Sequence, residues 1–305
     1  MGTVHPIRDQ SHMALGSAVE AFLVTLDHPE SWGTRRVYAS TLRALRAEFG
    51  DATDTGTLEP GHVAAWFTRQ WGQAAPATWN RNLDAIRSAQ RYWQDQGWMK
   101  VIDLTSALRR RQRAADRSRA LSRADVERLL TREDISIRER TLWRLLYETA
   151  ARSAEVLRLD VGDLDLPNRK AKVRRKGGAI DVIIWQTGTA RLLPRLLKGR
   201  KAGPVFLTDR RARVQLPPCD IDPASGRARL SYRQAEDLFK AASGGATLHQ
   251  LRHSALTHDA EAGASTPMLM AKSGHTSVAS LALYARPSAE ALARWQEHND
   301  PARRR

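Results

Sequence analysis

The chain has 305 residues and a formal net charge of +16, and 42% of its residues are hydrophobic. This composition is typical of globular proteins and excludes a disordered chain. No run approaches the roughly 18 apolar residues of a membrane span, and the first ten residues lack the apolar segment of a secretory signal peptide. Cys219 is the single cysteine, which excludes internal disulfides and cysteine-rich zinc sites. We therefore expect a cytoplasmic protein with no membrane partner, whose charge favours a polyanion such as DNA or RNA.

Residues 13–100 predict an all-α domain of four or five amphipathic helices. Apolar residues recur at three- and four-residue spacing in 13–26 and 34–49. Pro60 stands where a third helix would begin, and Gly97 is placed to end a fourth. Six of the nine tryptophans lie here, and their helical spacing favours a core role over base stacking.

Residues 101–120 join this domain to the rest of the chain and show little apolar periodicity. We predict a basic interdomain linker whose cations follow a phosphate backbone; a merely solvated linker is the alternative. The arginines concerned are Arg109, Arg110, Arg111, Arg113, Arg117 and Arg119.

The remaining chain predicts an α-rich domain with a small antiparallel β-sheet, so the fold class is mainly α. Ser122 and Ser153 are expected N-caps of two helices. Gly177 and Gly178 follow Lys176 and mark a hairpin turn between two short strands. The expected helices cover 122–130, 138–147, 153–159 and most of 231–297; the expected strands cover 172–174, 180–183 and 204–207; and 210–229 is expected to be a loop.

One helical segment has side chains suited to binding an anionic oxygen. His249 and His253 have the spacing of two zinc-protease ligands, but Gln250 replaces the glutamate base, so we expect no metal. There is also no glycine-rich phosphate loop ending in Lys-Ser or Lys-Thr, hence no sign of ATP use. His249 and Arg252 are spaced i, i+3 and share a helix face, where imidazole and guanidinium can both donate hydrogen bonds to an anion.

The order of several short motifs resembles the tyrosine recombinase (phage integrase) family. The motifs are Ala151-Arg152-Ser153-Ala154-Glu155, Arg175-Lys176-Gly177, His249-Gln250-Leu251-Arg252, Ser273-Gly274-His275 and, nine residues later, Tyr284. They are similar to the family's Arg-x-x-Glu box, Gly-Lys-Gly turn, His-x-x-Arg box, Gly-His pair and nucleophilic tyrosine. The chain departs from the pattern at Arg175, where the family has glycine. The resemblance implies the catalytic set Arg152, Lys176, His249, Arg252, His275 and Tyr284, with Glu155 orienting Arg152.

The resemblance implies a site-specific DNA recombinase that uses neither metal nor ATP. Tyr284 would form a covalent 3′-phosphotyrosyl bond with DNA, His249 would accept the phenol proton, and Lys176 would protonate the leaving 5′-oxygen. A homotetramer would act on two double-stranded DNA duplexes in the nucleoid. The domains would be a core-binding domain at 13–100, the linker at 101–120, a catalytic domain at 121–298 and a basic tail at 299–305.

The predicted turn follows two arginines that are further candidates for DNA binding. We expect Arg174 and Arg175 to join the linker arginines as DNA contacts, since both lie next to the predicted turn. Three other functions share some of these features: a type IB topoisomerase-like enzyme that relaxes DNA, a DNA-binding protein that has lost cleavage, and a nonspecific RNA-binding protein.

Overall fold

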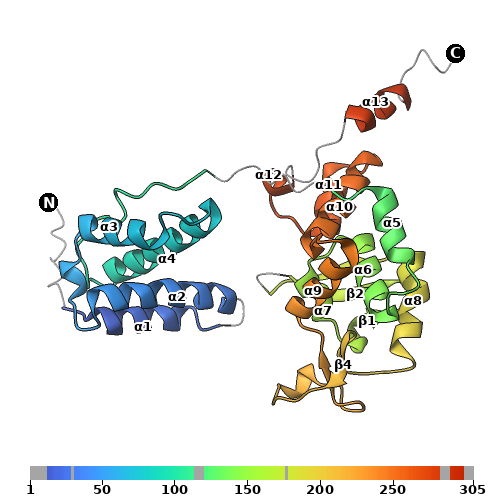
Figure 1. The fold of residues 1–305 in the computed structure, drawn as a ribbon, viewed down its shortest axis with the longest axis horizontal. Helices are drawn as coiled ribbons and strands as arrows, with labels where there is room; N and C mark the ends of the chain where they lie inside the picture. Colours follow the sequence, from blue (N-terminus) through green and yellow to red (C-terminus); the bar gives the residue numbers. More distant parts are fainter. Residues whose placement is uncertain (1–11, 29–30, 113–119, 176–177, 282–288, 299–305) are drawn as a thin grey trace, which may run out of the picture. The chain divides into compact units, whose positions relative to one another are not determined.

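The computed structural model describes residues 12–28, 31–112, 120–175, 178–281 and 289–298. The chain forms two compact units, Met1–Arg117 and Ser118–Arg305 (Figure 1). Both are built mainly from helices, with two small antiparallel sheets in the second unit. The predicted mainly α fold class is confirmed. No helix in the described part of the chain has the length and apolarity needed to span a membrane.

The N-terminal unit packs four α-helices around an aromatic core. Trp66, Trp79 and Trp93 are at most 5% exposed, and the Trp93 indole N–H donates to the Ala18 carbonyl at 2.9 Å. The core role expected for these tryptophans is therefore confirmed, whereas Trp32 is exposed. The helices are α1 (Leu15–Thr25), α2 (Trp32–Phe49), α3 (Pro60–Trp71) and α4 (Pro76–Asp95), with a short 3-10 turn, η1, at Thr55–Thr57.

Residues 101–112, expected to be linker, pack onto the N-terminal unit instead. Leu104 and Leu108 are buried in its core, and the Gln90 side-chain oxygen accepts from the Leu104 N–H at 2.9 Å. The Arg111 guanidinium lies 3.8 Å from the centroid of the Trp79 ring. Apolar periodicity did not predict this packing, because the segment is not helical and only a few of its side chains are buried.

The second unit surrounds a core that includes Trp143, Phe206 and Phe239. Hydroxyl side chains cap several of its helices; Ser122, for example, accepts from the Asp125 N–H at 3.0 Å, as predicted. Ser153 was expected to be an N-cap but is the first residue of the short helix α7 (Ser153–Leu157). This helix begins one residue earlier than predicted, and Arg152 is its N-cap. The other helices are α5 (Arg123–Thr131), α6 (Ile137–Thr149), α8 (Thr187–Leu197), α9 (Tyr232–Ser243), α10 (Leu248–Glu261), α11 (Thr266–Ser273), α12 (Val278–Leu281) and α13 (Ala289–His298).

The main sheet has the order β1-β2-β3 and is antiparallel throughout. The predicted hairpin is present, with Lys172 opposite Val182 and Gly178 in the left-handed region at φ +80°. The hairpin closes where the Arg175 N–H donates to the Ala179 carbonyl at 2.8 Å. Its strands are β1 (Leu164–Asp165), β2 (Lys170–Arg174) and β3 (Ile180–Ile184).

The prediction of a third strand at 204–207 is wrong. Val205 and Phe206 are buried in the core, while Pro204, which has no N–H to donate, makes one isolated bridge to Asp160. The strand begins later: β4 (Leu207–Arg211) pairs with β5 (Arg227–Arg229) in a separate two-stranded sheet, with a 3-10 turn, η3 (Pro218–Asp220), between them. The expected loop at 210–229 thus contains regular structure.

Candidate active site

The N-terminus of α7 holds Arg152 against a buried carboxylate. Glu155 is 6% exposed, and its Oε2 accepts from the Arg152 backbone N–H at 3.0 Å. Its Oε1 accepts from Arg152 Nη1 at 2.9 Å. A guanidinium has five N–H donors, and 40% of the Arg152 side chain is exposed. Glu155 therefore orients Arg152 while leaving part of its guanidinium accessible to an anion.

Helix α10 supplies the second arginine. A Thr247–Gln250 capping box fixes the start of this helix, so Gln250 has a structural role. Arg252 lies near the start of this helix and is 5% exposed. Its guanidinium donates to the Ala150 carbonyl at the end of α6 and, through Nη2, to the Ser273 carbonyl at 2.9 Å. These bonds hold the guanidinium of this α10 residue against the ends of α6 and α11.

His275 follows the end of α11, where Gly274 adopts φ +66°. The Ser273 hydroxyl donates to the Leu269 carbonyl at 2.6 Å, so it accepts from Nδ1–H of His275 across 2.7 Å. Nε2 then faces Arg252 Nη2 at 3.4 Å as an acceptor. Burial, together with the positive charges of Arg252 and Arg152, lowers the pKa of His275 to about 4. The imidazole is therefore neutral at pH 7 when no DNA is bound.

An NMR titration of the DNA-free protein should give His275 a pKa of about 4. An unfolded histidine titrates near 6.5, so between these values the unfolded chain binds more protons. The contribution of neutral His275 to stability is complete above about pH 6.5 and is lost as the pH falls toward 4. Arg252→Ala should raise this pKa because it removes a neighbouring positive charge. A pKa near 6.5 in the wild-type protein would contradict this geometry.

Arg175 has a place that the sequence analysis missed. It was expected to contact DNA, but its side chain is only 8% exposed. It donates to Glu155 Oε2 at 2.7 Å and to Asp181 Oδ2 at 2.9 Å. The signal was the strand alternation: Ala171 and Val173 face the core, so two-residue periodicity carries Arg175 inward. Arg174 is exposed on the opposite face.

The structure describes His249 and some of the linker arginines among the other predicted site residues. His249 is exposed on α10, one turn before Arg252, and lies near enough to His275 to help lower its pKa. Lys176 and Tyr284 lie outside the described residues, as do Arg113, Arg117 and Arg119. Of the described linker arginines, Arg109 is exposed and Arg110 pairs with Asp84, whereas Arg111 donates to the carbonyls of Gly72 and Ala74.

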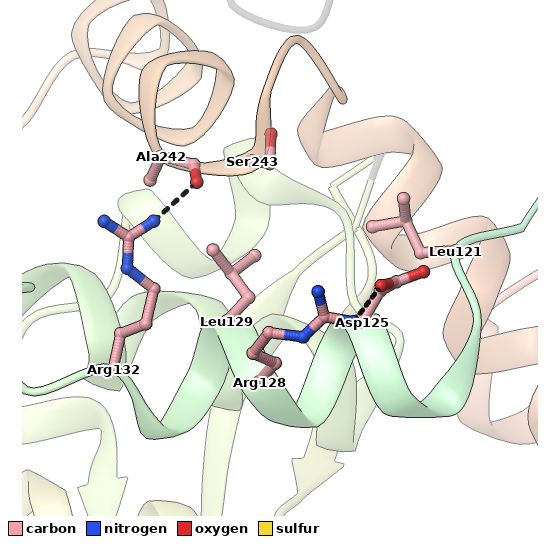
Figure 2. Close-up of a pocket in the computed structure, with 7 residues that line it drawn as sticks. All are labelled: Leu121, Asp125, Arg128, Leu129, Arg132, Ala242 and Ser243. Atoms are coloured by element: carbon pink, nitrogen blue, oxygen red, sulfur yellow. Dashed lines mark hydrogen bonds and ion pairs between the residues drawn. The ribbon is translucent and has the colours of Figure 1, made fainter.

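A separate pocket of about 400 Å³ lies between α5 and the end of α9 (Figure 2). Its arginines are already engaged: Arg132 donates to the Ala242 carbonyl at 2.8 Å, and Arg128 pairs with Asp125 at 2.5 Å. None of the predicted catalytic residues lines it, so it takes no part in the site described above. Its lining residues are Leu121, Asp125, Arg128, Leu129, Arg132, Ala242 and Ser243.

Comparison with known proteins decides the family. Residues 119–291, more than half of the chain, match the phage integrase family. The chain belongs to the phage integrase family. Tyrosine recombinase XerC of Mycobacterium sp. (strain KMS) is 27% identical over 292 residues, which cover 88% of this chain and 93% of the relative.

Solved structures share the integrase fold at lower identity. The XerH site-specific recombinase in a post-cleavage complex with a palindromic difH substrate has a TM-score of 0.67 at 17% identity, covering 95% of both chains. A lambda integrase tetramer bound to a Holliday junction has a TM-score of 0.68 at 15% identity, covering 92% of this chain and 79% of the other. This integrase is thus a tyrosine-type site-specific recombinase, and all six predicted catalytic positions fall within the matched region.

Proposed function

We propose that this recombinase cleaves and rejoins DNA through a 3′-phosphotyrosyl bond on Tyr284, without metal or ATP. The observation that carries the proposal is a continuous hydrogen-bonded network in the described part of the second unit. It runs from Arg152 through Glu155 and Arg175 to the Ser273 carbonyl, and on to Arg252 and His275. The network joins two arginines that are 100 residues apart in the chain, one of them partly accessible and one rigidly held.

The chemistry explains why two arginines are needed. A phenol with a pKa near 10 is a weak nucleophile at pH 7, and the transition state places extra charge on the non-bridging phosphate oxygens. Arg152 and Arg252 neutralise this added charge more than they stabilise the ground state, which lowers the barrier. We assign proton removal from Tyr284 to His249 and protonation of the leaving 5′-oxygen to Lys176. The covalent bond conserves the energy of the broken linkage, so a 5′-hydroxyl of another duplex can attack and complete strand transfer.

His275 changes role when the phosphate arrives. In the DNA-free protein its Nε2 accepts from Arg252 and its pKa is lowered to about 4. A phosphate anion next to the ring favours the protonated imidazole and raises this pKa. Nε2 can then donate to a non-bridging oxygen, while Nδ1–H stays on Ser273.

We assign DNA binding to exposed basic side chains, and we propose that several copies of the chain assemble on two duplexes. Arg109 and Arg174 are exposed and suited to backbone contacts, and we keep Arg110, Arg113, Arg117 and Arg119 in the same proposed set. The lambda integrase tetramer on a Holliday junction supports a homotetramer acting on two duplexes. The corresponding cellular location is the cytoplasmic nucleoid.

A trapping experiment tests the reaction. Nicked site DNA that loses its 5′-hydroxyl fragment after cleavage should accumulate a covalent protein–DNA adduct, and peptide mapping should place the DNA on Tyr284. The yield should be the same with EDTA and without nucleotide, because protein side chains supply all the charge stabilisation. Inhibition by EDTA would favour a metal mechanism, and the absence of any adduct would favour a DNA-binding protein without cleavage.

A further inference from the structure

We propose that Arg175 is a positioning residue that holds the Arg152 and Arg252 sides of the site in register; this proposal rests on the function proposed above. Its guanidinium contacts three elements of the second unit. It donates to Glu155 on α7 at 2.7 Å, to Asp181 on β3 at 2.9 Å and to the Ser273 carbonyl at the end of α11 at 3.4 Å. The side chain is 8% exposed, so these contacts form inside the protein.

The first consequence concerns the carboxylate that orients Arg152. Glu155 is buried and has two oxygens to satisfy; Oε1 takes Arg152 Nη1, and Oε2 takes both the Arg152 N–H and Arg175 Nη1. A buried carboxylate is costly unless it is paired and hydrogen-bonded. Without Arg175, Oε2 keeps a single backbone donor and the carboxylate can rotate. Arg152 would then lose the fixed direction in which it meets the phosphate.

The second consequence concerns the turn that presents His275. The Ser273 carbonyl accepts from both Arg175 and Arg252, so one oxygen joins the two arginines. The next residue is Gly274, and a Cβ placed there would lie 2.6 Å from Arg175 Cζ. Its φ of +66° also favours glycine. The arginine at 175 and the glycine at 274 therefore fit each other, and Arg175 supports the turn directly before His275.

Arg175 directly follows β2 and stands immediately before Lys176 in the sequence. The hairpin closes on its backbone, since the Arg175 N–H donates to the Ala179 carbonyl at 2.8 Å and the Gly178 N–H donates to the Arg175 carbonyl at 3.1 Å. Asp181, on the returning strand, accepts from the same side chain. One residue thus contacts the segments that carry Arg152 and His275 and both strands of the hairpin.

The test compares Arg175→Gln with Arg138→Gln in the full chain. Arg138 is a matched control because its side chain is 9% exposed and pairs with two carboxylates, Glu139 and Asp209, away from the site. Both variants should melt at lower temperature than wild type. At saturating protein, Arg175→Gln should slow single-turnover adduct formation about 100-fold, the scale expected for a misplacement of about 1 Å, with an unchanged Kd for site DNA. Arg138→Gln should keep the wild-type rate.

Further variants separate positioning from loss of folding. Glu155→Gln combined with Arg175→Gln should cost less than the product of the two single losses, because part of the Arg175 effect passes through the Glu155 carboxylate. If Arg175→Gln shows no cooperative melting, Arg175→Lys takes its place in the test. One ammonium cannot reach all three partners, so the rate of adduct formation by Arg175→Lys should fall about 10-fold. A rate for either folded variant within about threefold of Arg138→Gln, about 0.7 kcal/mol in barrier height, would overturn the proposal. A wild-type chain that forms no adduct would overturn the proposed function, and this inference with it.

Discussion

Tyr284→Phe should form no covalent adduct with site DNA while its Kd for that DNA stays at the wild-type value. The substitution removes one oxygen, the atom proposed to attack phosphorus, and leaves the ring in place. Loss of the serine nucleophile of one well-studied hydrolase costs about 10⁶-fold in kcat. Adduct formation on nicked DNA, followed on denaturing gels, and binding by gel shift measure the two effects separately.

Tyr147→Phe is the matched control for this prediction. The Tyr147 hydroxyl contacts His258 Nδ1 at 2.7 Å, and burial raises the pKa of this phenol, which is the opposite of what a nucleophile needs. The variant should lose only the roughly 1 kcal/mol of stability typical of one hydrogen bond and keep full cleavage. An adduct in Tyr284→Phe would move the nucleophile to another residue, and a large loss of DNA binding would assign Tyr284 a structural role.

Arg252→Ala should lower the rate of adduct formation by about 10² to 10³, the usual cost of removing one donor that stabilises transition-state charge. The Kd for site DNA should change far less, because the contact strengthens only as charge develops on the phosphate. The substitution also leaves the carbonyls of Ala150 and Ser273 without this donor. Rates must therefore be measured well below the melting temperature of the variant.

Arg252→Lys separates charge from geometry. A lysine keeps the positive charge but lacks the planar fork that bridges two carbonyls, so we expect a rate between those of wild type and Arg252→Ala. Equal losses of rate and affinity in Arg252→Ala would make this residue a binding contact and would remove it from the proposed catalytic set.

Local patterns in the sequence predicted much of the fold. Apolar spacing placed α2 and α4 to within a few residues, and the turn signal at Gly177 and Gly178 predicted the β2–β3 hairpin. These features follow from the pitch of a helix and the conformational freedom of glycine, which depend on neighbours a few residues apart. The order of motifs from Arg152 to His275 likewise indicated the family that the comparisons show.

Tertiary structure decided what depends on residues distant in the chain. Pairing of β4 with β5 replaced the expected third strand, and residues 101–112 joined the N-terminal core through a few buried side chains. By itself the sequence determined most of the helices, the hairpin and the order of reactive residues, but it did not predict α8 or the division of 231–297 into separate helices. Only the fold buried Arg175 between Glu155 and Ser273 and lowered the pKa of His275, because burial and charge proximity arise when segments about 100 residues apart pack together.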